Sequence, residues 1–166
     1  MDQGTRNILG LCKDIEESCA GIYFHYAEIF AEIPEARNLW EKAAFEEKNH
    51  ANLLKMALNC RDLKLGVEAT DLFRYRNVAN MVRSILDDLR RVSPTLEDAL
   101  RSSISLEKKL SEFHLDFVAR FENESEGRLF CQLAKADADH VADLENAYRE
   151  LIDRQKSKPP AVASEA

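Results

Sequence analysis

The sequence has few of the residues that interrupt helices. Only five of its 166 residues are glycine and four are proline. Because these two residues are the least favourable in a helix interior, their scarcity beside abundant alanine, leucine, glutamate, lysine and arginine favours helix over most of the chain. We therefore predict an all-α protein, and the length suits a single domain with a sizeable core.

The sequence also lacks an excess of basic residues and a long apolar run. Its formal net charge is −7, which excludes a basic footprint for DNA or RNA and a basic face for anionic lipid. No run approaches the roughly 20 apolar residues that a membrane span requires, and residues 1–4 do not begin a secretory signal. We predict a cytoplasmic protein with neither nucleic acid nor membrane as a partner.

Paired cysteines are missing as well. The four cysteines form no Cys-x-x-Cys pair, so the sequence indicates neither a zinc knuckle nor a rubredoxin-type iron site. Cys12 and Cys19 share one helix face but lie two turns apart, about 10 Å, which is too far for a disulfide.

Four long helices are predicted from the spacing of apolar residues. In the first, a seam runs from Cys12 to Phe30 with alternating intervals of four and three residues, which is typical of a packed bundle helix. Pro34 is suited to open the second helix, and Ser93 and Pro94 are suited to open the third. The predicted helices are 5–30, 34–59, 94–121 and 125–155; a crossover, 60–93, contains an amphipathic helix at 78–89, and 156–166 form a disordered tail.

Acidic residues and histidines lie within these apolar seams. Glu47 and His50 are three residues apart and face the core together, and Asp137 and His140 repeat this arrangement 90 residues later. Each pair is preceded by a seam glutamate about 30 residues earlier in the partner helix of its hairpin. The two preceding acids are Glu16 and Glu107, although a small rotation of the first helix would exchange Glu16 for Glu17.

The six side chains are expected at one level of the bundle. Helix rise places Glu16 about 22 Å, and Glu47 about 18 Å, from the turn that joins their helices, and the same estimate holds for Glu107 and Asp137. Four carboxylates in a low-dielectric core repel one another strongly, and two divalent cations cancel this charge. The sequence therefore predicts a dinuclear metal site whose oxygen-rich ligation with imidazole suits iron or manganese, with zinc as an alternative.

The arrangement resembles the ferritin-like di-iron carboxylate proteins, which use one glutamate from each of two helices and Glu-x-x-His from each of the other two. Residues 106–114, LEKKLSEFH, are similar to the first-helix motif of the rubrerythrin-like branch, and residues 46–51, EEKNHA, to its second. The resemblance covers about residues 5–155. It implies a ferritin-like four-helix bundle with two iron ions, and it assigns the ligands as Glu16, Glu47, His50, Glu107, Asp137 and His140.

The chain departs from that family pattern in three ways. Asp137 stands where the family has glutamate and is one methylene shorter, so any asymmetry of the site is expected on its side. Leu110 replaces a further glutamate that full rubrerythrins carry and that is associated with ligand exchange, and the C-terminal rubredoxin domain is absent. The resemblance also suggests Tyr23 as a hydrogen-bonding neighbour of the metals, and the position of His114, two turns from Glu107, suggests the same for that histidine.

The leading functional hypothesis is a di-iron oxidoreductase, peroxidase-like or ferroxidase-like, that reacts with hydrogen peroxide or O₂ and receives electrons from a separate donor protein. A ferritin-like role in iron oxidation and storage is the second hypothesis. A metal-free helical interaction module, in which the six residues are protonated, salt-bridged or displaced, is the third. The long seam helices are compatible with a homodimer.

Overall fold

The computed structural model describes residues 1–60, 63, 66, 69–118 and 124–157. Throughout this part of the chain the regular secondary structure is α-helical. The helices are α1 (Gln3–Ile29), α2 (Pro34–Ala57), α3 (Ala69–Leu89), α4 (Leu96–Val118) and α5 (Glu124–Ser157). The prediction of an all-α bundle with an additional helix in the crossover is confirmed.

The first two helices begin at residues suited to that position. The Asp2 carboxylate accepts a hydrogen bond from the backbone N–H of Thr5 at 2.8 Å and caps α1. Pro34 is the first residue of α2, where its missing N–H is not needed. The predicted starts were residues 5 and 34, so α1 begins two residues earlier than expected.

The later helices differ from the predicted bounds mainly at their ends. The hydroxyl of Thr95 accepts a hydrogen bond from the N–H of Asp98 at 3.1 Å, which starts α4 at Leu96 rather than at residue 94. Helix α3 begins nine residues before the predicted 78–89 segment. Helix α5 continues to Ser157, so the first two residues of the predicted tail are helical. The rest of that tail lies outside the described residues.

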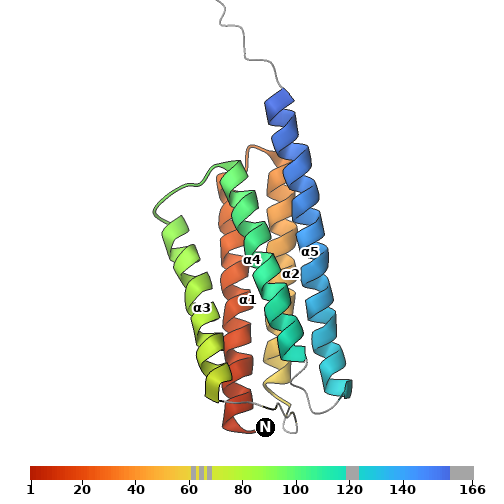
Figure 1. Ribbon diagram of the computed structural model, residues 1–166. Coiled ribbons are helices and arrows are strands. Elements are labelled where there is room, and N and C mark those ends of the chain that lie inside the picture. The colour runs from red at the N-terminus through yellow and green to blue at the C-terminus, as the bar shows by residue number, and fades with distance from the viewer. Residues whose placement is uncertain (61–62, 64–65, 67–68, 119–123, 158–166) are drawn as a thin grey trace, which may run out of the picture.

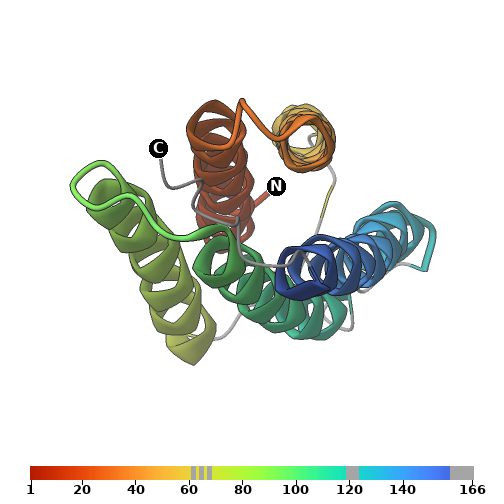
Figure 2. The ribbon, with the colours of Figure 1, turned by 90° about the horizontal axis from the view of Figure 1, so that it is seen from above.

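Two hairpins make up the bundle. Helices α1 and α2 form one and α4 and α5 form the other, and the view along the axes places these four helices at the corners of a bundle (Figure 2). Helix α3 runs the length of the bundle outside this core, beside α1 (Figure 1). Tyr75 of α3 also packs against Phe113 of α4, with ring centroids 4.3 Å apart. The crossover therefore places α4 antiparallel to α3 and alongside the first hairpin.

Aromatic residues fill the core near the turn between α1 and α2. Trp40 is fully buried, and its ring lies 4.9 Å from that of Tyr26 and 5.7 Å from that of Tyr23. At Gly21 an added Cβ atom would lie 3.1 Å from a methyl carbon of Leu86, which shows how closely α3 approaches α1. None of the described helices has a stretch long and apolar enough to cross a membrane.

Candidate metal centre

A layer of polar side chains crosses the middle of the apolar core. Each of the seven residues involved is at most 7% exposed. Because a buried charge without a partner costs several kcal/mol, roughly, such a layer requires internal compensation. The residues are Glu16, Glu47, His50, Glu107, His114, Asp137 and His140.

Five of the six predicted ligands form two overlapping donor groups. One ligand atom from each of Glu16, Glu47 and His50 lies within 4.8 Å of the others. The same holds for Glu47, Glu107 and His140. Glu47 belongs to both groups, so its two carboxylate oxygens stand between two neighbouring positions, each suited to one cation.

The structure distinguishes the two adjacent glutamates of α1. Glu16 faces the layer and is 1% exposed. The Glu17 side chain is 56% exposed and pairs with Lys13 at 2.7 Å. The rotation of α1 therefore presents Glu16, and not Glu17, to the candidate centre.

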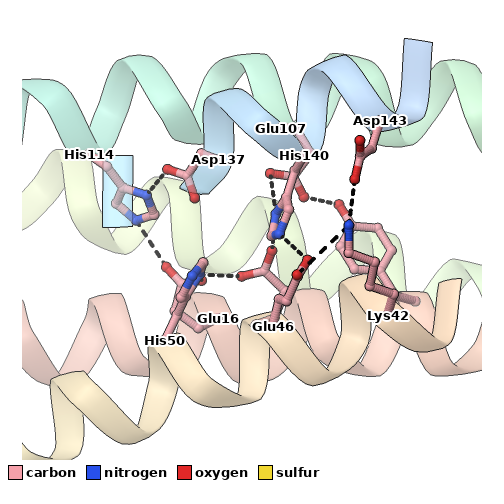
Figure 3. Close-up of polar contacts among 11 residues, drawn as sticks. Glu16, Lys42, Glu46, His50, Glu107, His114, Asp137, His140 and Asp143 are labelled. Carbon is pink, nitrogen blue, oxygen red and sulfur yellow. Dashed lines mark hydrogen bonds and ion pairs between the residues drawn. The ribbon is translucent and has the colours of Figure 1, made fainter. Parts of the chain in front are cut away.

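Asp137 lies outside both donor groups. One of its carboxylate oxygens is 2.6 Å from Nδ1 of His114, while Nε2 of the same ring is 3.0 Å from a carboxylate oxygen of Glu16 (Figure 3). His114 therefore lies between Asp137 and Glu16. Direct ligation of a metal by Asp137 stays a prediction.

Two further contacts hold the second donor group in place. The Tyr23 hydroxyl donates a hydrogen bond to one carboxylate oxygen of Glu107. A carboxylate oxygen of Glu46 lies 2.7 Å from Nε2 of His140 and accepts a hydrogen bond from its N–H (Figure 3). Nδ1 of the same ring lies 3.1 Å from a carboxylate oxygen of Glu47. Tyr23 thus contacts one of the predicted ligands, and its role beside a metal stays a prediction.

Glu46 is a residue that the seam analysis missed. Its side chain is 37% exposed, and it precedes Glu47 on a neighbouring face of α2, so it does not belong to the apolar stripe. Lys42 lies next to it and reaches across to Asp143 of α5 at 2.6 Å (Figure 3). The feature of the sequence that could have indicated Glu46 is the pair of consecutive acids at residues 46 and 47, because His140 of α5 contacts both.

The buried carboxylates have divergent proton affinities. Although burial opposes the change, the contact with His114 helps to lower the pKa of Glu16 to about 2. Burial and the nearby charge of Glu16 raise the pKa of Glu47 above its usual value. Burial likewise raises the pKa of Glu107, against the influence of His140. The electrostatic repulsion between buried carboxylates thus acts on Glu47, the residue that both donor groups share.

The imidazoles hold protons strongly in this environment. Burial alone would lower the pKa of each ring, but Glu16 and Glu47 raise the pKa of His50 to about 10. Glu107 and Glu47 raise the pKa of His140 to about 11. Glu16 and Asp137 raise the pKa of His114 well above its usual value. Protonated imidazoles therefore balance the carboxylates, and a cation must displace these protons to bind.

Several oxygen and nitrogen atoms in the layer that could bind a metal ion make no hydrogen bond to the residues that the structure describes. Their positions show whether these residues fit a metal. Among the described residues, six buried atoms in this layer lack a well-aligned hydrogen bond although they lie close to one another. They are both carboxylate oxygens of Glu16, one of Glu47, one of Glu107, Nε2 of His114 and Nδ1 of His140. Because buried polar atoms are normally satisfied, this convergence of oxygen and nitrogen donors fits divalent cations.

Comparison with known proteins gives the family. The model described as Rubrerythrin matches residues 7–148, which include every residue of the layer. The chain belongs to the rubrerythrin family. No curated protein matches the chain.

A solved structure supports the fold of this rubrerythrin family member. Symerythrin from Cyanophora paradoxa, reduced with dithionite, superposes with a TM-score of 0.62 at 20% sequence identity. The match covers 92% of this chain and 88% of symerythrin. The predicted ferritin-like bundle is confirmed. Leu110, at the position where full rubrerythrins are expected to carry a further glutamate, is 2% exposed and packs in the core.

The Glu46 contact can be tested by an isosteric change. We expect Glu46→Gln to weaken cation binding at the second donor group by about 10–100-fold, because an outer carboxylate that orients a histidine typically contributes this much. Binding at the first group should be unchanged. Titration with Co²⁺ monitored by visible absorbance measures both steps. The matched control is Glu41→Gln, which changes a half-buried acid on α2 that pairs with Arg37. Equal weakening at both positions would count against the assigned role.

Proposed function

We propose that the protein is a dinuclear iron protein that reacts with hydrogen peroxide or O₂ and is reduced by a separate electron-donor protein. The observation that carries this proposal is the pair of donor groups joined at Glu47. Two positions that share one carboxylate suit two neighbouring metal ions. Family membership supports the same assignment.

Different residues of the chain would hold the two metal ions and orient their ligands in the proposed centre. Glu16, Glu47 and His50 would hold the first metal ion, and Glu47, Glu107 and His140 the second. Tyr23 fixes Glu107 and Glu46 fixes His140 through the hydrogen bonds described above. The residues of the layer are at most 7% exposed, and burial strengthens the electrostatic interactions among them.

Iron bound here would supply the exchange of electrons with the oxidant. Oxygen-rich ligation with a few imidazoles suits iron or manganese better than the soft metals, which prefer thiolates. Leu110 brings no further carboxylate into the layer. We therefore expect slower turnover with peroxide than in family members that have that additional acid.

The deciding experiment is anaerobic titration of metal-free protein with ferrous ions, followed in separate samples by O₂ and by hydrogen peroxide. We expect two iron ions per chain, and oxidation is followed by the near-ultraviolet absorbance of ferric iron. Faster oxidation by peroxide supports the peroxidase-like reaction. Binding well short of two ions per chain would overturn the dinuclear proposal.

Two other outcomes correspond to the alternative functions. Faster oxidation by O₂ with continued uptake beyond two iron ions per chain would favour storage over the redox role. For a metal-free interaction module, replacing His50 and His140 by alanine would leave metal content unchanged. A double variant that retains the wild-type metal content therefore contradicts the proposal.

A further inference from the structure

The buried polar layer comes nearest to the surface between α2 and α5. Its four carboxylates are each 1% exposed, whereas His50 of α2 and His140 of α5 are the most exposed of the seven residues, at 7% and 6%. The two rings stack with centroids 5.8 Å apart. Helices α2 and α5 occupy neighbouring corners of the bundle (Figure 2) and contact each other far less than the helices within either hairpin do. The shortest path from solvent to the layer therefore runs between these two helices.

Charged side chains cover this path directly outside His140. Glu46 bonds to Nε2 of His140 through one carboxylate oxygen, and its other oxygen lies 4.0 Å from Nζ of Lys42 (Figure 3). The same ammonium lies 2.6 Å from a carboxylate oxygen of Asp143 on α5. The exposed fraction of the side chain falls from 47% at Asp143 to 37% at Glu46 and 7% at His140. These contacts thus form a continuous polar path from solvent to the second donor group.

Lys42 occupies the place that a cation would take on this path. The hydrogen bond with Asp143 and the charges of Glu46 and Asp139 raise the pKa of Lys42, although its partial burial opposes this change. One ammonium facing three carboxylates leaves an excess of negative charge, which attracts further cations. Carboxylate oxygens also suit hard divalent cations such as Mn²⁺. The acids that hold the ammonium are therefore suited to hold a divalent ion in its stead.

The ammonium can leave this position without disturbing the core. The Lys42 side chain is 57% exposed and has a flexible four-carbon stem. Ion pairs between exposed side chains contribute little to stability, because water solvates the separated charges nearly as well. The Lys42 side chain can therefore turn into solvent, which leaves Glu46 and Asp143 open to an arriving ion.

A surface ion pair that only joins two helices would explain Lys42 and Asp143, but not Glu46. Glu46 contacts the exposed ammonium with one oxygen and a buried imidazole with the other. The opposite nitrogen of that imidazole, Nδ1 of His140, is buried and lacks a well-aligned hydrogen bond among the described residues. It lies 3.1 Å from Glu47. Glu46 therefore connects the surface charges to a donor atom that faces the centre.

We propose that divalent cations enter the centre between α2 and α5, where Glu46 and Asp143 form the first site that they meet and Lys42 closes it. An arriving ion displaces the ammonium, and no covalent bond is made or broken in this exchange. The ion then passes to the second donor group, which contains His140. This route rests on the proposed dinuclear centre and adds a way in for its metal ions.

The test is the rate at which Co²⁺ enters metal-free protein, measured by stopped-flow visible absorbance. We expect Lys42→Gln to raise the association rate constant by about 3–10-fold, because it removes a positive charge and the ammonium that fills the site. Asp143→Asn should lower the rate constant by about 3–10-fold, because it removes a carboxylate that attracts the ion. Both variants should still bind two ions per chain after equilibration, since neither residue belongs to a donor group.

Two exposed residues elsewhere provide matched controls for the change of charge. Lys48→Gln alters a lysine of α2 whose ammonium lies over the ring of Phe24, and Glu150→Gln alters an exposed acid two turns after Asp143 on α5. Both should bind Co²⁺ at the wild-type rate. The effects of Lys42→Gln and Asp143→Asn should shrink as the salt concentration rises, because salt screens exposed charges.

Failure of the route differs from failure of the centre. Wild-type protein that binds two cobalt ions, with a rate that neither Lys42→Gln nor Asp143→Asn changes more than the controls do, contradicts the route alone. Wild-type protein that binds fewer than two ions contradicts the dinuclear centre itself. Circular dichroism establishes the folding of each variant before rates are compared, and Lys42→Met, which keeps the apolar stem without the charge, replaces Lys42→Gln if the latter does not fold.

Discussion

Replacing Glu47 by glutamine is expected to abolish cation binding at both positions of the centre. Glu47 is the residue common to the two donor groups, and a neutral amide can neither cancel the charge of two cations nor bind both. We expect affinity to fall by at least about 100-fold at each position, beyond the usual cost of losing an outer partner. Metal content after equilibration with Co²⁺ and gel filtration measures the effect.

Neighbouring acids provide the controls for this variant. Glu16→Gln should weaken the first position and spare the second, whereas Glu107→Gln should do the reverse. Glu17→Gln changes an exposed residue of α1 and should bind two ions per chain. Glu47→Gln that still binds two ions, or Glu16→Gln that loses both equally, would show that the two donor groups are not separate positions.

The stability of the metal-free protein is expected to fall as the pH rises from 7 to 9. In the folded chain the pKa is about 10 for His50 and about 11 for His140, both above the ordinary value of 6.5. A raised pKa means that the folded state binds the proton more tightly, so its contribution is fully present below pH 6.5 and is lost as the pH approaches 10–11. At about 1 kcal/mol per imidazole and pH unit, the unfolding free energy should drop by roughly 2–5 kcal/mol.

Urea unfolding at several pH values, in the presence of a chelator, measures this loss. The variant His50→Gln, His140→Gln should show a much flatter dependence over the same range. Affinity for Co²⁺ should change in the opposite direction, rising with pH because binding displaces protons from the imidazoles. A wild-type unfolding free energy that is constant between pH 7 and 9 would contradict protonation of these rings in the folded chain.

The helices and most of the candidate centre could be predicted because they depend on periodicity. The apolar seam of α1 locates Glu16, and the interval from Glu47 to His50 places both side chains on one face whatever packs against them. The matching interval from Asp137 to His140 then indicates that the two hairpins meet at one level. These inferences need only helix geometry and the lengths of the connections.

The hydrogen-bonding partners could not be predicted in the same way. Whether Asp137 points to the donor groups or to His114 depends on the rotation of α5 against α4 and on one methylene of reach, and periodicity defines neither. Glu46 was missed because its partner His140 belongs to the other hairpin and its own side chain is only half-buried. Predicting such contacts requires knowing how helices that are far apart in the sequence pack against one another.

The centre also lies where the two halves of the chain meet. Within each hairpin the helices approach closely along their length, whereas α2 and α5 touch only lightly. Contacts of Tyr23 with Glu107, of His140 with Glu47 and of Lys42 with Asp143 connect the hairpins at this level. Because proteins open locally in cooperative units, we expect each hairpin to separate from the other as a unit. The contacts of the centre join the two hairpins at this level. A metal ion bound at this level would therefore be expected to hold the two hairpins together, and its removal to make their separation easier.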